Sequence, residues 1–209
     1  MTRIFLLSPA NCGGLRARQL MSGRASFPLA VHLRTAGAPL GDVFSFMSGL
    51  YFRGKLTYAL RFARRGDADV AVLERGVFVM TPGAGLRSPD TIVTAAALER
   101  FARVEVAVDE PAYRRPLEAA ATVLAEAAPD AEFVLLGSVA TPKYVDVLAG
   151  LLGERLVFPP AFVGRGDMSR GGLLLRHAAA GIELEYVPVA GAVRRGPRPP
   201  KLAPLGRPT

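Results

Sequence analysis

Six short apolar runs, each closed by turn-forming residues, constrain this chain more than any other feature of its sequence. They occupy residues 4–9, 77–81, 104–108, 133–137, 156–158 and 184–189. Runs of this length without polar alternation are typical of strands buried on both faces of a parallel sheet. Stretches with helical spacing separate them. We therefore predict an α/β fold: a single three-layer, Rossmann-like domain whose mostly parallel sheet has about five or six strands.

Two of the intervening stretches carry clear helical signals. Residues 42–64 place apolar side chains at helical spacing, and we expect this helix to break near Gly49 and Gly54. Pro116 can open a second, alanine-rich helix because its missing N–H has no partner in the first turn of a helix. Pro129 then stops that helix.

Composition excludes several classes of protein. Half of the 209 residues are hydrophobic and the mean hydropathy is +0.27, which excludes wholesale disorder. A single cysteine, Cys12, argues against a disulfide framework and a cysteine-rich zinc module, and two histidines, His32 and His177, argue against a histidine-built metal centre. No motif identifies a cofactor. The apolar runs are too short for a membrane span or an export signal, so with a free Cys12 we expect a cytoplasmic protein.

Basic residues are concentrated at the C-terminal end. The formal net charge is +8, and residues 191–209 contribute +5 because they contain five basic residues and no acidic one. These are Arg194, Arg195, Arg198, Lys201 and Arg207. The five prolines of the same segment favour an extended chain. We predict an α/β domain over residues 1–190, followed by a basic, proline-rich tail over 191–209 that is flexible or wraps the surface.

Four loops that follow predicted strands carry the candidate site. They span residues 8–16, 81–90, 137–144 and 159–170. Ligands bind beyond the carboxyl ends of the strands in an open parallel sheet, so we expect all four loops to meet at one rim. Glycines allow a close backbone approach, and helix starts can hold anions. The expected pocket residues are Ser8, Asn11, Gly83, Gly85, Gly137, Ser138 and Thr141. Ser138 and Thr141 also suit ordinary helix caps.

Charged and aromatic side chains near these loops indicate how a ligand would be held. We expect Tyr51 to stack on a base. Phosphate or carboxylate would be held by Arg53, Lys55, Lys143, Arg165 and Arg170. Asp167 and Asp90 are the candidate acid or base, although Asp167 serves equally well as the cap of a helix that ends before Gly181. Cys12 has no evident basic partner, so we assign it no nucleophilic role.

Parts of these loops resemble a known family. The first strand ends in Leu7-Ser8-Pro9-Ala10, residues 47–51 read Met-Ser-Gly-Leu-Tyr, and Thr81-Pro82 precedes Gly85-Leu86. Over about the first 95 residues this resembles the YaaA-like peroxide-stress proteins. It is also similar to the lysine-transferring domain of archaeosine synthases, but the cysteine-serine-lysine loop of that domain is replaced here by residues 11–14, so lysine transfer is not implied. The resemblance implies a Rossmann-like sheet related in outline to uracil-DNA glycosylases, and an association with nucleic acids or modified bases.

Three functional hypotheses follow from the residues and the resemblance. The first is a protein that binds a nucleotide or nucleic-acid phosphate at the rim and, as a hydrolase or transferase, processes a nucleobase or its N-glycosidic bond. The second is a DNA-binding stress-response protein without enzymatic activity, whose basic tail makes most of the contact. The third is a subunit that docks on a protein partner through residues 191–209.

Overall fold

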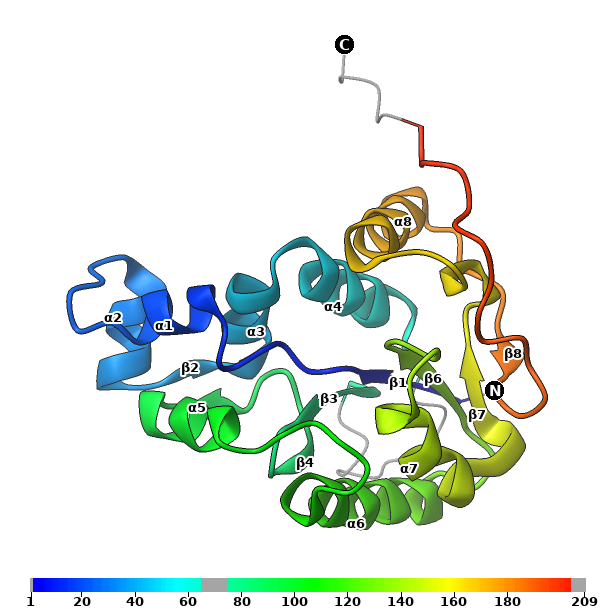
Figure 1. Cartoon of the computed structure of the whole chain (residues 1–209), viewed down its shortest axis with the longest axis horizontal. Coiled ribbons are helices and arrows are strands. Elements are labelled where there is room, and N and C mark those ends of the chain that lie inside the picture. Colours follow the sequence, from blue (N-terminus) through cyan, green and yellow to red (C-terminus); the bar gives the residue numbers. More distant parts are fainter. Residues whose placement is uncertain (1, 65–74, 204–209) are drawn as a thin grey trace.

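A six-stranded, mostly parallel sheet organises the computed structural model, which describes residues 2–64 and 75–203 (Figure 1). The four central strands run parallel, whereas the two outermost strands, β4 and β8, pair antiparallel with their neighbours. Across the sheet the order is β4 (Gly85–Arg87), β3 (Val77–Thr81), β1 (Arg3–Leu7), β6 (Glu132–Leu136), β7 (Leu156–Phe158) and β8 (Val187–Pro188). The predicted α/β class and mostly parallel sheet are confirmed.

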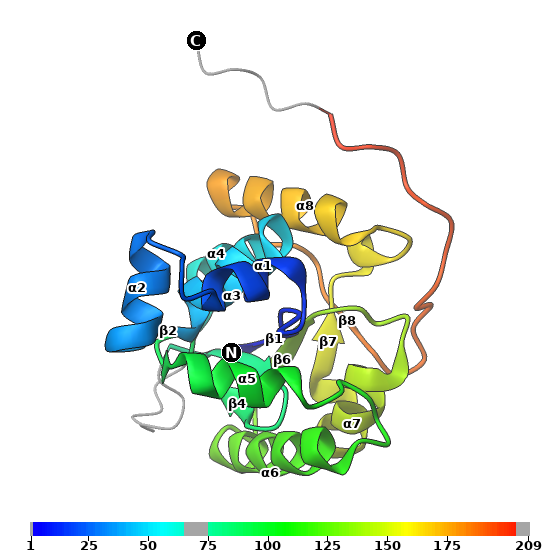
Figure 2. The same ribbon diagram turned by 60° about the vertical axis from the view of Figure 1, so that its left-hand side comes forward.

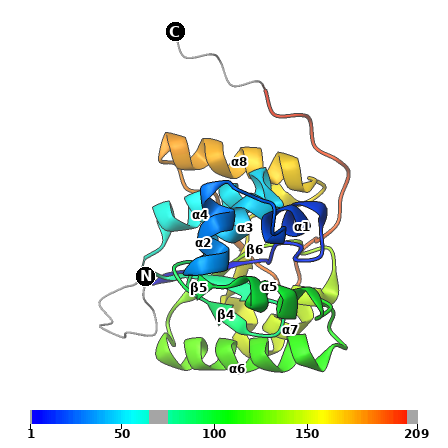
Figure 3. The same cartoon turned by 90° about the vertical axis from the view of Figure 1, so that its left-hand side faces the viewer.

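Helices pack against both faces of this sheet. They are α1 (Leu15–Met21), α2 (Pro28–Thr35), α3 (Leu40–Ser48), α4 (Leu50–Phe62), α5 (Ala95–Ala102), α6 (Pro111–Ala127), α7 (Pro142–Leu152) and α8 (Asp167–Ala180). Phe5 and Leu7 of β1 belong to a core shared with α1–α5 and α8, whereas Ile4 and Leu6 belong to a core shared with α6 and α7. Figures 2 and 3 show α8 and α6 on opposite sides of the sheet. Burial on both sides explains why these strands are continuously apolar.

The long helical stretch breaks once, at Gly49. The φ angle of Gly49, +63°, lies in a region that residues with a side chain rarely adopt, and Gly49 separates α3 from α4. Gly54, the other expected break, lies inside α4. A Cβ on Gly54 would lie 2.7 Å from the carbonyl oxygen of Gly171 in α8. The glycine therefore allows close helix packing and does not interrupt the helix.

Two sequence predictions are wrong. Residues 104–108 form no strand and instead connect α5 to α6. The edge of β3 on which they could have paired is taken by its hairpin partner β4. The helix expected from Pro116 begins earlier, at Pro111, where the Glu110 carboxylate accepts a 2.9 Å hydrogen bond from the N–H of Ala112. A side-chain cap therefore fixes the start, and Pro116 is accommodated inside the helix. The sequence reading also missed the short pairing of β2 (Ala38–Pro39) with β5 (Ile92–Val93).

Residues 191–203 of the predicted tail lie along the surface, beside β7, β8 and α8 (Figure 1). The Arg195 guanidinium donates to the Ala140 carbonyl at 3.1 and 3.3 Å, and Arg165 donates to that of Pro200 at 3.4 Å. Leu202 packs against the core that contains α8. The described part of the tail therefore wraps the surface, whereas Arg207 lies outside the described residues.

No helix among the described residues is long and apolar enough to cross a bilayer.

Candidate functional site

One cavity lies at the carboxyl ends of β1 and β6, where the strand order reverses its direction across the sheet. From β1 the next parallel strand is β3 on one side, and the following one is β6 on the other. Loops leaving such a point diverge and leave a crevice, which is where open α/β sheets bind ligands. The cavity here has a volume of about 480 Å³. Its position is therefore the one that the strand order favours for a ligand.

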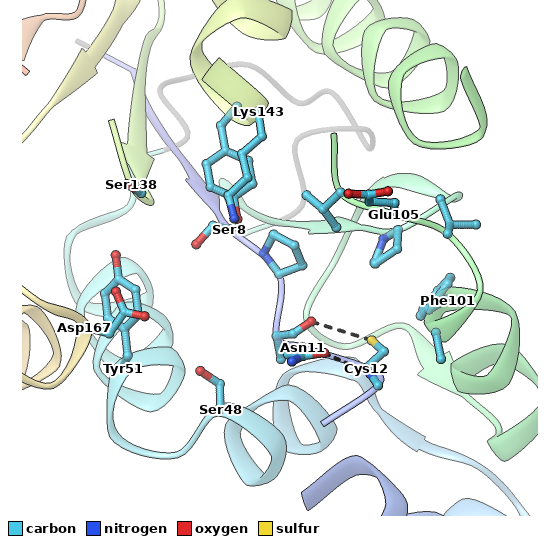
Figure 4. Close-up of a pocket in the computed structure, with 18 residues that line it drawn as sticks. Ser8, Asn11, Cys12, Ser48, Tyr51, Phe101, Glu105, Ser138, Lys143 and Asp167 are labelled. Carbon is cyan, nitrogen blue, oxygen red and sulfur yellow. Dashed lines mark hydrogen bonds between the residues drawn. The ribbon is translucent and has the colours of Figure 1, made fainter. Parts of the chain in front are cut away.

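Six separate segments line this cavity (Figure 4). One side holds Asp167 and Tyr51, and the other holds Glu105 and Phe101. The polar and titratable side chains are Ser8, Asn11, Cys12, Ser48, Tyr51, Glu105, Ser138, Lys143, Tyr144 and Asp167. Because they come from β1–α1, α3–α4, α5–α6, β6–α7 and α8, the cavity exists only when the whole domain is folded.

A buried lysine lies beneath the cavity and contacts Ser8. The Lys55 side chain is 1% exposed, and its Nζ donates to the Ser8 carbonyl oxygen at 2.6 Å. The same Nζ lies 2.8 Å from the Ser8 Oγ and 4.5 Å from the centre of the Tyr51 ring. Burial lowers the pKa of Lys55 to about 7 because it disfavours the charged amine, while Asp167 raises this pKa and Arg170 lowers it further. Lys55 can therefore exist as a neutral amine near physiological pH.

Close packing of α4 against α8 places Lys55 there. A Cβ on Gly171 would lie 2.7 Å from the Leu50 carbonyl oxygen, just as one on Gly54 would meet Gly171. The two helices therefore touch backbone to backbone. This contact brings Tyr51 and Lys55 of α4 next to Asp167 and Arg170 of α8.

Gly137 gives the same kind of close approach between β6 and β1. A Cβ at this position would lie 3.0 Å from the Ser8 Cβ and 3.3 Å from the Tyr144 ring. The glycine expected at a ligand therefore shapes the site by letting Ser8 and Tyr144 come together.

Two tyrosines add buried hydroxyl groups to the cavity. The Tyr51 hydroxyl is buried and has no hydrogen-bond partner among the described residues. Burial raises the pKa of Tyr51 and of Tyr144, and nearby Arg170 and Ser8, respectively, act in the opposite direction. Both hydroxyls therefore stay protonated at neutral pH and can donate hydrogen bonds.

The positive ends of two helices face the same rim. α7 follows β6, and α8 follows β7 after a short 3-10 turn at Pro160–Phe162, so both helices begin at the carboxyl edge of the sheet. Neither Thr141 before α7 nor Gly166 before α8 supplies a side-chain cap. Asp167, in the first turn of α8, is largely exposed and lies 3.6 Å from the Arg170 guanidinium. Asp167 already supplies one negative charge at these helix starts. The helix starts themselves favour a negatively charged group in the cavity.

Cys12 lines the cavity as a protonated thiol. Its Sγ lies 3.7 Å from the Ala10 carbonyl oxygen, and burial raises its pKa to about 12. A thiolate nucleophile is therefore disfavoured, in line with the sequence analysis.

The structure brings most of the predicted site residues together. Those that line the cavity are Ser8, Asn11, Tyr51, Ser138, Lys143 and Asp167. Lys55, Gly137 and Arg170 support them through the contacts described above. Four loops were expected to contribute, and three of them do so with polar side chains.

The loop at residues 81–90 departs from the expected rim because β3 and β4 form a hairpin. Of this loop, Pro82 lines the cavity. Gly83 lies in the turn against Val104, and Gly85 lies so close to Pro116 that a Cβ would meet its carbonyl oxygen. β4 then carries the chain back, and Asp90 pairs with Arg75 at 3.1 Å, away from the cavity. The predicted role of Asp90 as an acid or base therefore has no geometric support.

Three other predicted residues lie in neighbouring regions. Arg53 lines an adjacent hollow with Arg16, and Thr141 lines another beside Arg195. Arg165 donates hydrogen bonds to the Ala161 and Pro200 carbonyls and to the Ser169 hydroxyl. It therefore holds the tail and the start of α8 instead of lining the cavity.

Sequence reasoning missed the wall formed by α5 and the segment after it. Phe101, Val104 and Glu105 line the cavity from there, although residues 104–108 were expected to be a strand. Ser48 and Tyr144 were also missed as site residues, although both lie inside segments that had been singled out, residues 47–51 and 137–144. No local signal marks Phe101 or Glu105, because their position depends on how the chain crosses the sheet edge.

Comparison with family models, with curated proteins and with solved structures found no match. The resemblance to YaaA-like proteins thus stays a prediction. Within residues 2–64 and 75–203, no cluster of three or more His, Cys, Asp or Glu side chains could hold a metal ion.

Proposed function

We propose that the cavity binds the phosphate of a nucleotide or nucleic acid. The observation that carries this proposal is the position of a polar cavity at the point where the strand order reverses, between β1 and β6. Phosphate-bearing ligands suit such crevices because helix starts offer N–H groups and a partial positive charge. As part of the same proposal, the α/β domain has the three-layer, Rossmann-like arrangement in which this mode of binding recurs.

Lys143 is the residue to which we assign the phosphate. It lies in the first turn of α7 and lines the cavity together with Ser138. An ammonium at a helix start adds a full charge to the partial charge of the helix. Tyr51 and Phe101 supply aromatic surface for a base on either side of the cavity.

Processing of a nucleobase or its N-glycosidic bond is the enzymatic form of this proposal. Asp167 is an exposed carboxylate at the cavity and has the chemistry of a general base or of a group that stabilises positive charge on a sugar. The proposed compartment remains the cytoplasm, where the free thiol of Cys12 would stay reduced.

A pair of lysine variants tests phosphate binding. Lys143→Gln should weaken binding of nucleotides or short oligonucleotides about tenfold or more, because it removes one charged hydrogen bond. Lys201→Gln in the tail is the matched control and should leave binding unchanged. Affinities measured by fluorescence anisotropy at several salt concentrations should fall as salt rises, with a smaller slope for Lys143→Gln.

The rival hypotheses give different results in the same assay. If the tail makes the contact, deletion of residues 191–209 abolishes nucleic-acid binding, and Lys143→Gln has little effect. If the tail docks on a protein, a stoichiometric partner is captured by the full chain and lost with the deletion. Affinity that is insensitive to salt and to Lys143→Gln would refute phosphate binding in the cavity.

A further inference from the structure

Ser8 and Lys55 have the arrangement of a nucleophile and its base. The Ser8 hydroxyl lines the cavity, and its Oγ lies 2.8 Å from the Lys55 Nζ. Lys55 also donates to the Ser8 carbonyl oxygen at 2.6 Å, which fixes the amine against the serine. We propose that these two residues form a catalytic dyad that cleaves carboxylic esters or amides through an acyl-serine intermediate.

The two contacts of Lys55 fit a neutral amine. Nζ is within donating distance of both the Ser8 carbonyl oxygen and the Ser8 Oγ. In the neutral amine of this proposal, one N–H keeps the bond to the carbonyl and the nitrogen lone pair accepts the Ser8 hydroxyl proton. A lysine in an apolar site is a known kind of base because its charged form is destabilised by burial. The amine lies over the rings of Tyr51 and Phe52, at 4.5 and 4.9 Å from their centres, and these contacts favour the charged form. Burial and Arg170 are therefore the effects that favour the neutral amine.

Titratable groups of three elements lie near Lys55, and two of them, both on α8, change its pKa. Asp167 and Arg170 of α8 act on it with opposite signs, and Arg170 favours the neutral amine. Tyr51 of α4 and Tyr144 of α7 face the same region with hydroxyls that stay protonated at neutral pH, because burial raises their pKa. Burial of Lys55 itself is the largest effect, and it lowers the pKa of the amine to about 7.

The proposed reaction has two balanced steps. In the first, the Ser8 Oγ attacks the carbonyl carbon, its proton passes to the Lys55 Nζ, and the ester or amide bond breaks as the leaving alcohol or amine takes that proton. In the second, water loses a proton to Lys55 and attacks the acyl-serine. The bond between the acyl carbon and the Ser8 Oγ breaks, the carboxylic acid leaves, and Lys55 returns its proton to the Oγ, which restores the Ser8 hydroxyl and the neutral amine. The cycle consumes one water and requires no oxidant or reductant.

The cavity offers hydrogen-bond donors for the developing oxyanion. Ser138 and Lys143 come from the loop and first turn that follow β6, next to the strand end that carries Ser8. Positive groups placed where negative charge develops are a major source of rate acceleration. This proposal goes beyond phosphate binding, since acylation of Ser8 does not require a phosphate on the substrate.

Covalent labelling of the full-length chain tests the dyad. A small fluorophosphonate should react with Ser8, forming a P–O bond and releasing fluoride, and mass spectrometry should locate one adduct on the peptide that contains Ser8. Ser8→Ala should reduce labelling and hydrolysis of p-nitrophenyl acetate about 100-fold or more. The alanine variant keeps the backbone carbonyl of residue 8, which accepts the hydrogen bond from Lys55, so the protein should still fold. Ser26→Ala, at an exposed position, is the control.

The dependence of labelling on pH tests the role of Lys55 without a variant. The rate for the unmodified protein should rise as pH increases through about 7 and then level off, because only the neutral amine can accept the proton. Lys55→Met, checked for folding by circular dichroism, should lose this rise along with the labelling. An unlabelled Ser8 in the folded protein, or a rate with no rise near neutral pH, would overturn the dyad. Neither result would affect the Lys143 test of phosphate binding.

Discussion

Burial of Lys55 links the stability of the protein to pH. Its pKa is about 7 in the folded state and 10.5 in the exposed state, so between these values the unfolded chain binds more protons than the folded one. Stability therefore rises with pH over this window, and the cost of burying the lysine is greatest below pH 7. From pH 7 to pH 9 this effect alone should add about 2 kcal/mol to the free energy of unfolding.

Lys55→Met should remove that dependence on pH. Methionine has a similar length and no charge, so the free energy of unfolding of the variant should change less than that of the parent between pH 7 and pH 9. Urea denaturation at both pH values gives the comparison, and taking the difference between the proteins cancels the other titrating groups. Equal slopes in the two proteins would mean that Lys55 does not titrate in this range.

Sequence alone could predict the residues that follow strands, but not the environment of Lys55. Ser8, Asn11, Ser138 and Lys143 were expected at a rim because they directly follow apolar runs, and the structure places all four at the cavity. Lys55 was expected to hold an exposed anion, whereas it is buried and holds Ser8. Its burial results from helix packing between distant segments, which no local pattern reveals.

At the scale of the element, adjacent glycines in α8 should respond in opposite ways to alanine. Gly171→Ala should destabilise the protein by about 1–3 kcal/mol, because its Cβ would meet the Leu50 carbonyl at 2.7 Å. Gly172→Ala should be neutral or stabilising by up to about 1 kcal/mol, since its Cβ makes an ordinary 3.5 Å contact with Leu202 and alanine favours a helix. Thermal or urea unfolding measures both.

The same pair connects helix packing to the site. Gly171→Ala should also slow Ser8 labelling, because it would shift α4, which carries Lys55, relative to Ser8. Gly172→Ala should label at the rate of the parent. If both variants unfold alike, the close α4–α8 contact does not hold these helices in place.

Sequence patterns predicted best the elements in which the spacing of apolar residues follows from which faces are buried. Four of the six expected strands form the parallel centre of the sheet, since both of their faces are covered. Residues 104–108 have a similar composition but no neighbouring strand to pair with, and they become a wall of the cavity. The hairpin turn after β3 was predicted to be a loop at the ligand-binding rim. Local sequence signals do not show whether the chain turns back into an antiparallel hairpin or crosses over to a parallel strand.

At the scale of the whole molecule, the tail should stabilise the face that it crosses. Deleting residues 191–209 removes the Arg195 and Pro200 hydrogen bonds and the packing of Leu202. We expect a loss of about 1–2 kcal/mol, or about 2–8 °C in Tm for a chain of this size. Hydrogen exchange should become faster in residues 163–170, which Arg165 connects to the tail.

Single substitutions separate this effect from the loss of charge. Arg195→Ala removes the bonds to Ala140, whereas Arg198 makes no hydrogen bond or ion pair within the described residues. Arg195→Ala should therefore reproduce part of the decrease in Tm, and Arg198→Ala should not. A deletion variant as stable as the full chain would show that the tail only rests on the surface.

The outer strands of the sheet affect how the protein behaves at high concentration. β8 has two residues, one of them the N–H-lacking Pro188, and β4 has three. Neither offers a long row of free donors and acceptors onto which another chain could add a strand. We expect the protein to resist edge-to-edge aggregation into extended β assemblies, even though the strands inside the sheet are apolar enough to drive it.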